Sequence, residues 1–108
     1  MSHRFRLKQG DTGPTISETL YNADGTTIDL TGASVYFHLT SRTGEVLVNA
    51  AGRVVNVAGV VAYDWVTGDS DTAGNHLREW ECHLADGTII TVPNDKAGYE
   101  VVIIKQGA

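Results

Sequence analysis

The stretch SVYFHLT at residues 34–40 alternates strictly between polar and apolar side chains. Its apolar residues fall at every second position, and a period of two is typical of a β-strand with one buried face. The same alternation recurs in VAYDW at residues 61–65 and in WECHL at residues 80–84. No window of eleven or more residues carries the apolar spacing of an amphipathic helix. The chain therefore reads as all-β.

Turn signals separate these runs. The pairs Asp24-Gly25 and Asp86-Gly87 tolerate the positive φ of tight hairpin turns. Such signals at short, regular intervals predict an antiparallel β-sandwich, immunoglobulin-like or related, with about eight strands and no long helix. The expected strands are residues 3–9, 15–22, 26–29, 33–41, 45–49, 52–58, 60–66, 75–85, 88–92 and 99–105.

Length and composition bound the class of protein. The 108 residues correspond to one domain over residues 1–108. One cysteine excludes an internal disulfide framework and a multi-cysteine zinc site. The first ten residues lack the apolar run of a signal peptide, and no apolar stretch is long enough to span a bilayer. We expect a soluble protein made in a reducing compartment.

The charge is unevenly distributed along the chain. The formal net charge is −5, and Arg4, Arg6 and Lys8 supply three of the eight positive residues. Residues 9–108 hold five Lys and Arg against thirteen Asp and Glu, a net charge of −8. Because phosphate neutralisation supplies most nucleic-acid affinity, this acidic body argues against a nucleic-acid partner. A membrane partner is not expected either.

The N-terminal segment is a candidate assembly contact made of Arg4, Phe5, Arg6, Leu7 and Lys8. In a strand, alternation places its cations on one face and its apolar side chains on the other. Two interpretations stay open. The charges protect an edge strand from stray pairing, or they form a basic stripe that docks onto an acidic partner. A second copy of this chain could supply that partner, so a homo-oligomer is expected.

The sequence gives little support for a nucleophilic catalytic site or for a metal site. Cys82 and His83 point to opposite faces of one strand, so they cannot pair as thiolate and imidazole. Cys82 shares its face with Trp80 and Leu84, which predicts a buried structural thiol. The four histidines lack the spacing of zinc ligands. We place Trp80 and Leu84 in the core, with Trp65 and Phe37.

The carboxylates give no catalytic signal. DSDT at residues 69–72 fits an acidic turn capped by its own side chains better than a cation loop. Glu79 and Glu81 lie about 6.5–7 Å apart on one strand face, but any pair two residues apart does so. We expect no enzyme, no catalytic residue, no metal site and no cofactor.

An ordered series of motifs spans most of the chain. It comprises KQGDTGP (8–14), DLTGA (29–33), VAYDW (61–65), DTAGNH (71–76), EWECHLADG (79–87) and TVPN (91–94). This series resembles the N-terminal domain family of tailed-phage baseplate upper proteins over roughly residues 8–105, and DLTGA is its most telling piece. The same five residues fit a turn in which Leu30 is buried, Asp29 bonds loop amides and Gly32 reverses the chain.

The resemblance implies a β-sandwich that holds a fibre or receptor-binding device onto a virion tail. The expected function is a structural, non-catalytic component of a bacteriophage virion, in the tail or baseplate region, that mediates assembly with other virion proteins. The expected location is the virion, assembled in the host cytoplasm. The alternatives are a capsid decoration protein and a host-surface carbohydrate-binding module, with Tyr36, Asn94, Asp95 and Tyr99 as candidate residues.

Overall fold

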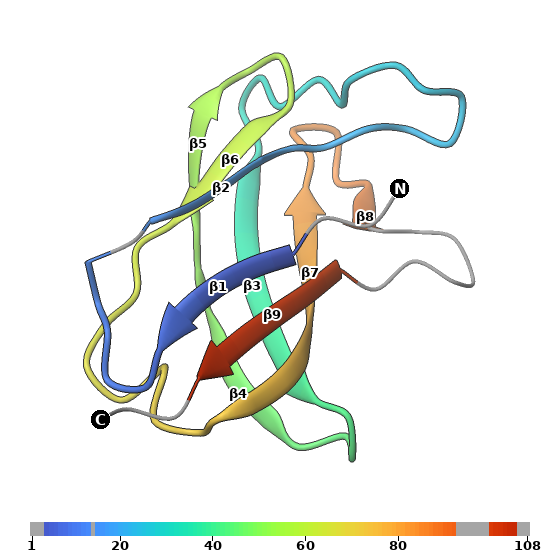
Figure 1. Cartoon of the computed structure of the whole chain (residues 1–108). Coiled ribbons are helices and arrows are strands. Elements are labelled where there is room, and N and C mark those ends of the chain that lie inside the picture. The colour runs from blue at the N-terminus through green and yellow to red at the C-terminus, as the bar shows by residue number, and fades with distance from the viewer. Residues whose placement is uncertain (1–3, 14, 93–99, 106–108) are drawn as a thin grey trace.

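A computed structural model describes residues 4–13, 15–92 and 100–105 and shows two β-sheets packed face to face (Figure 1). The strands are β1 (Arg4–Lys8), β2 (Ile16–Thr19), β3 (Ser34–Ser41), β4 (Val46–Ala51), β5 (Arg53–Asn56), β6 (Val60–Tyr63), β7 (Gly74–His83), β8 (Ile89–Val92) and β9 (Glu100–Lys105). The β-sandwich predicted from alternation is confirmed, with nine strands in the described residues where about eight were expected. No described segment forms a helix long and apolar enough to cross a membrane.

Sheet A is the larger layer. Its strands run in the order β1-β9-β7-β3-β4, and β8 pairs with the second half of β7. Sheet B holds three strands in the order β2-β6-β5. Because buried and half-buried residues alternate along β3 and β7, each strand has an inner face toward the core and an outer face away from it.

Residues 26–29 do not form the predicted strand. They contribute one isolated bridge, between Tyr21 and Thr27. The Asp24 carboxylate accepts a hydrogen bond from the Thr26 N–H at 2.9 Å, which closes a turn here instead. A short side chain that bonds the backbone two residues on competes with strand pairing.

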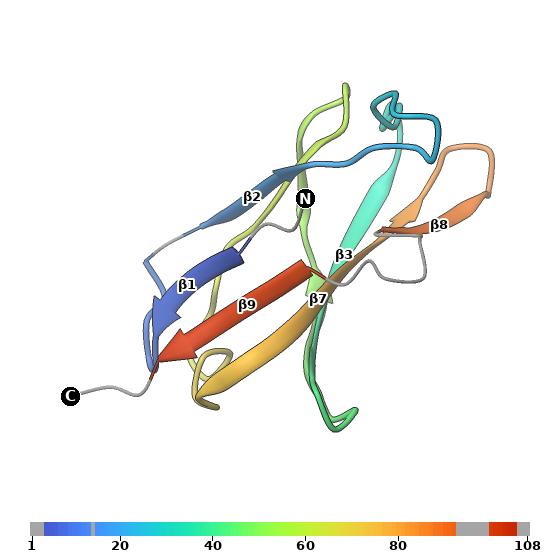
Figure 2. The ribbon, with the colours of Figure 1, turned by 45° about the vertical axis from the view of Figure 1, so that its right-hand side comes forward.

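The strands β1 and β9, the first and last along the described chain, lie side by side and run in the same direction (Figure 2). Arg6 is level with Ile103, and Leu7 with Ile104. The sheet is therefore mixed, where an antiparallel one was predicted. The alternation of side chains shows that a segment is a strand, but it does not encode the direction of its neighbour.

Aromatic rings fill the centre of the sandwich. Phe37 lies among them, with ring centroids 4.7 Å from Tyr63, 5.0 Å from Trp80 and 5.5 Å from Trp65. Trp65 and Trp80 are 4% and 0% exposed, so their predicted place in the core is confirmed. Leu84 is only partly buried, because β7 ends at His83 and the chain turns outward there.

One buried ion pair joins the two sheets. The Arg78 guanidinium of β7, 2% exposed, contacts the carboxylate of Glu18 on β2. The Trp80 indole N–H donates to the same carboxylate at 3.2 Å. Buried charges need such partners. The contact ties β2 to β7, because it joins a buried cation of one sheet to a carboxylate of the other.

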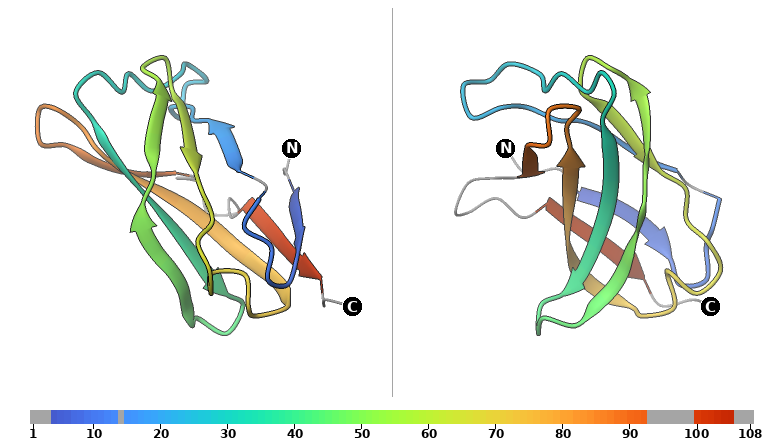
Figure 3. Two further views of the ribbon diagram at one scale, coloured as in Figure 1. Left: turned by 90° about the vertical axis from the view of Figure 1, so that its left-hand side faces the viewer. Right: turned by 180° about the vertical axis from the view of Figure 1, so that it is seen from behind.

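The chain passes from sheet A to sheet B at Gly52. Seen from behind, β4 and β5 form one continuous path along this side (Figure 3). The Gly52 N–H donates to the Val35 carbonyl at 2.9 Å. A Cβ atom here would lie 3.0 Å from the Trp80 ring and 3.1 Å from the Ala62 carbonyl. Glycine is therefore needed for close packing.

Candidate interaction surface

The described residues contain no group of three or more His, Cys, Asp and Glu side chains placed to hold a metal ion. His76 is buried at the start of β7, and its Nε2 bonds the Thr72 carbonyl at 2.8 Å. The turn at residues 69–72 is also occupied by internal bonds. Asp69 accepts hydrogen bonds from the Tyr63 hydroxyl and from the Val66 N–H, and the Ser70 hydroxyl donates to the Asp11 carbonyl at 2.9 Å.

Cys82 is a core residue, as predicted. It is 0% exposed, and burial raises the pKa of its thiol to about 11, with a smaller contribution from the negative charge of Glu81. A thiol with a raised pKa supplies little thiolate near neutral pH. Its chemistry is therefore that of a small apolar side chain.

The five predicted contact residues form β1, at the edge of sheet A. Leu7 is 5% exposed, and Phe5 is half-buried against Trp65 with ring centroids 6.1 Å apart. These two side chains close the protein's own core, so they are not available to a partner. Arg6 and Lys8 are exposed on the outer face, and the backbone of Arg4 lies in the same strand, level with Val101.

A further cation joins this group from the other end of the sequence. Lys105 of β9 is exposed and lies directly beside Lys8. We call Arg6, Lys8 and Lys105 the basic edge. Like charges directly opposite one another destabilise a sheet. An anionic partner surface would therefore stabilise the basic edge. The sequence pattern missed Lys105 because only the parallel pairing of β1 with β9 brings it there.

Two carboxylates share the outer face of sheet A. Glu79 and Glu81 alternate with the buried residues of β7 and point away from the core. Across the strand pair, Glu79 is level with His38, and Glu81 with Tyr36. The Glu81 carboxylate contacts His83 Nε2 at 2.6 Å, and Glu81 is 33% exposed. We call Glu79 and Glu81 the acidic patch.

Most other described carboxylates have local partners. Asp24, Asp29 and Asp86 each bond the N–H of the residue two positions on. Bonds to Thr26, Thr31 and Thr88 respectively hold these three pKa values below their usual range. Hydrogen bonds from Arg53 and then Thr15 lower the pKa of Asp64. Glu45 and Asp71 are exposed, in loops. The acidic patch is thus the part of the described strands where carboxylates face solvent together.

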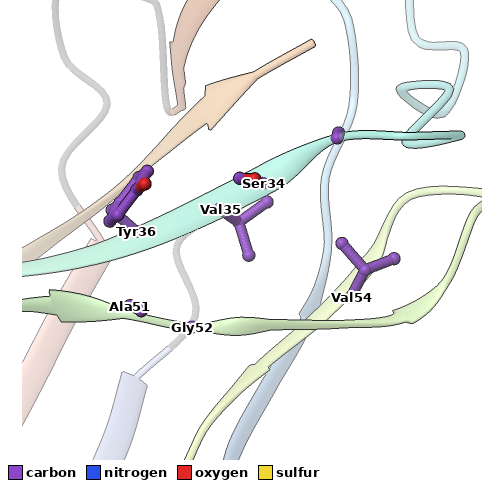
Figure 4. A pocket seen from close by; sticks show the side chains of 7 residues that line it. Ser34, Val35, Tyr36, Ala51, Gly52 and Val54 are labelled. Carbon is purple, nitrogen blue, oxygen red and sulfur yellow. The ribbon is translucent and has the colours of Figure 1, made fainter. Parts of the chain in front are cut away.

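A shallow hollow of about 300 Å³ lies where β4 leaves β3 (Figure 4). Its lining consists of backbone and small side chains around Val35, Gly52 and Val54, with Tyr36 at its rim. No charged side chain lines it. The hollow therefore lacks convergent polar groups that would orient a small ligand.

The comparisons with known proteins give a fold likeness. No family model matches the chain, and no curated protein matches it. Among solved structures, the crystal structure of CopC from Methylosinus trichosporium OB3b is similar, with a TM-score of 0.52 and 11% sequence identity. The match covers 99% of this chain and 88% of the CopC chain. At that identity, the likeness shows a shared β-sandwich fold alone.

The predicted role in a bacteriophage virion is wrong on this comparison. A solved structure that shares the fold over 99% of this chain is CopC, and its description names no virion protein. The baseplate, tail, capsid-decoration and carbohydrate-binding alternatives are contradicted with it, and Asn94, Asp95 and Tyr99 lie outside the described residues. The motifs misled because they specify turns and core positions, which many unrelated β-sandwiches need. The resemblance to the baseplate family stays a prediction.

Proposed function

We propose that this protein is a non-catalytic interaction module that associates with further copies of itself through the basic edge. The observation that carries the proposal is the separation of apolar and charged side chains onto opposite faces of β1. Phe5 and Leu7 pack inward, while Arg6 and Lys8 stand exposed beside Lys105. A chain with a formal net charge of −5 gathers three of its cations at one corner of one sheet.

The competing explanation is protection of the edge strand, in which the charges only prevent unwanted strand pairing. The two explanations differ in their dependence on a partner. Cations that dock onto an anionic surface contribute to association, and salt weakens that contribution. Cations that only protect an edge oppose association, so removing them would promote it.

Sedimentation velocity of the full chain over a range of concentrations, at low and high salt, tests the proposal. The parent should self-associate at low salt and dissociate at high salt. The variant Arg6→Ser/Lys8→Ser should stay monomeric at concentrations where the parent associates. Since both side chains are exposed, its thermal unfolding should match that of the parent.

A matched control removes two charges elsewhere. Arg42 is exposed in the turn after β3, and Arg53 forms an exposed pair with Asp64 at 2.8 Å, a kind that contributes little to stability. Arg42→Ser/Arg53→Ser should therefore associate like the parent. A parent that is monomeric in every condition, or an Arg6→Ser/Lys8→Ser variant that associates as strongly as the parent, would overturn the proposal.

A further inference from the structure

Within one chain, the basic edge and the acidic patch cannot neutralise each other. Arg6 is level with Ile103, which is level with Asn75 on β7. Glu79 lies four residues farther along β7, about 13 Å, and β7 is two strands away from β1, about 10 Å. The two backbones are thus roughly 16 Å apart, beyond the combined reach of the two side chains.

Direct pairing of two β1 edges is also disfavoured. An antiparallel pair of β1 strands centred on Arg6 would place Arg6 opposite Arg6, and Arg4 opposite Lys8. Like charges directly opposite each other destabilise a strand pair. The Lys8 N–H, in addition, already donates to the Asp11 carboxylate at 3.1 Å. A second copy must therefore meet the basic edge with a different surface.

We infer that the acidic patch on the outer face of sheet A receives the basic edge of a second copy of this chain. This inference rests on the proposed self-association and names its acceptor surface. The charges are complementary, and both groups lie on the same outer face, Arg6 and Lys8 on β1 and Glu79 and Glu81 on β7. The side chain of Glu81 is 33% exposed, and that of its contact His83 is 40% exposed.

Because the donor and the acceptor lie on the same face, two copies can make both contacts reciprocally and close a symmetric dimer. Where only one of the two contacts forms between a pair of copies, each copy keeps one unused donor or acceptor, and association continues to a closed ring or an open chain. In both arrangements the same two surfaces meet, so the contact is testable with two complementary variants, one without the donor and one without the acceptor.

The acceptor variant is Glu79→Gln/Glu81→Gln, which keeps the side-chain shape and removes two negative charges. Its self-association should be weaker than that of the parent by about two- to thirty-fold, as expected for the loss of two surface charge pairs. The matched control, Glu45→Gln/Asp24→Asn, removes two exposed loop carboxylates away from both surfaces and should associate like the parent. Thermal unfolding of both variants checks that they fold.

Mixing supplies the decisive result. Arg6→Ser/Lys8→Ser keeps its acidic patch, and Glu79→Gln/Glu81→Gln keeps its basic edge. At concentrations where each variant alone is monomeric, an equimolar mixture should form a 1:1 heterodimer that grows no further. If the acceptor variant self-associates like the parent while the donor variant does not, the acceptor assignment is wrong and the proposed function stands. If neither variant differs from the parent, both fall.

Discussion

Trp80 connects packing and polarity at one position. Its ring fills the centre of the sandwich beside Phe37, at 0% exposure, and its N–H reaches the carboxylate of Glu18 on the opposite sheet. Alternation along residues 80–84 was enough to predict burial. The contact with Glu18 could not be predicted, because 62 residues separate the two in sequence.

Replacing Trp80 should therefore cost stability in two separable parts. Trp80→Ala should lower the free energy of unfolding by about 3–5 kcal/mol, as for other large aromatic residues removed from a core. Trp80→Phe keeps much of the ring but removes the N–H, and should cost about 1–3 kcal/mol. Urea unfolding followed by circular dichroism measures both. Equal midpoints for Trp80→Ala and the parent would contradict the core assignment.

Cys82 should be inert in the folded protein. Its thiol is fully buried and its pKa is raised to about 11 by burial, so a thiol reagent at neutral pH should label it slowly. Labelling should become fast and stoichiometric in denaturant.

The same shift has a defined effect on stability. The pKa of Cys82 in the folded protein exceeds its ordinary value of 9.0. The stability that the folded state gains from its neutral thiol is therefore fully present below pH 9. It is lost as the pH rises from there toward 11. In the labelling experiment, rapid reaction of the native protein near pH 7 would contradict the burial of Cys82.

The passage of the chain between sheets depends on one glycine. Gly52→Ala would place a Cβ atom 3.0 Å from the Trp80 ring and 3.1 Å from the Ala62 carbonyl. We expect a loss of about 1–3 kcal/mol, as for overpacked cores. Gly13→Ala is the control, since nothing lies within 4 Å of its Cβ position, and it should change stability by less than about 0.5 kcal/mol. Equal melting temperatures for the two variants would show that the corner tolerates a side chain.

The strands themselves were largely predictable, because half-buried strands carry a period of two and tight turns need Asp, Asn or Gly. The turn at residues 29–33 folds as expected. Leu30 is 1% exposed, the Asp29 carboxylate bonds the Thr31 N–H at 3.0 Å, and Gly32 has a φ of 71°. Strand neighbours were less predictable, since the parallel pairing of β1 with β9 joins the two ends of the chain.

For the whole molecule, the local alternation of side chains predicts the fold class. The basic edge, in contrast, is created by strand pairing between distant parts of the sequence. Arg6 and Lys8 were recognisable as a stripe from their spacing alone. Lys105 was not, because it lies 97 positions after Lys8 and only the sheet brings them together. Glu79 and Glu81 were noticed as a pair, but their relation to the basic edge depends on the strand order of sheet A. Function inferred from turn motifs failed because such motifs specify a fold.

The parallel contact between β1 and β9 also determines how the protein carries mechanical load. Five residue pairs join the strands, from Arg4 with Val101 to Lys8 with Lys105. A force that pulls Arg4 and Lys105 apart draws the two strands past each other along their length. All the hydrogen bonds between them are then loaded in shear at the same time. A hairpin pulled at its open end instead loses its hydrogen bonds one after another. The first and last strands therefore act as a clamp, and tension applied at the two ends meets its main resistance there before any other strand is stretched.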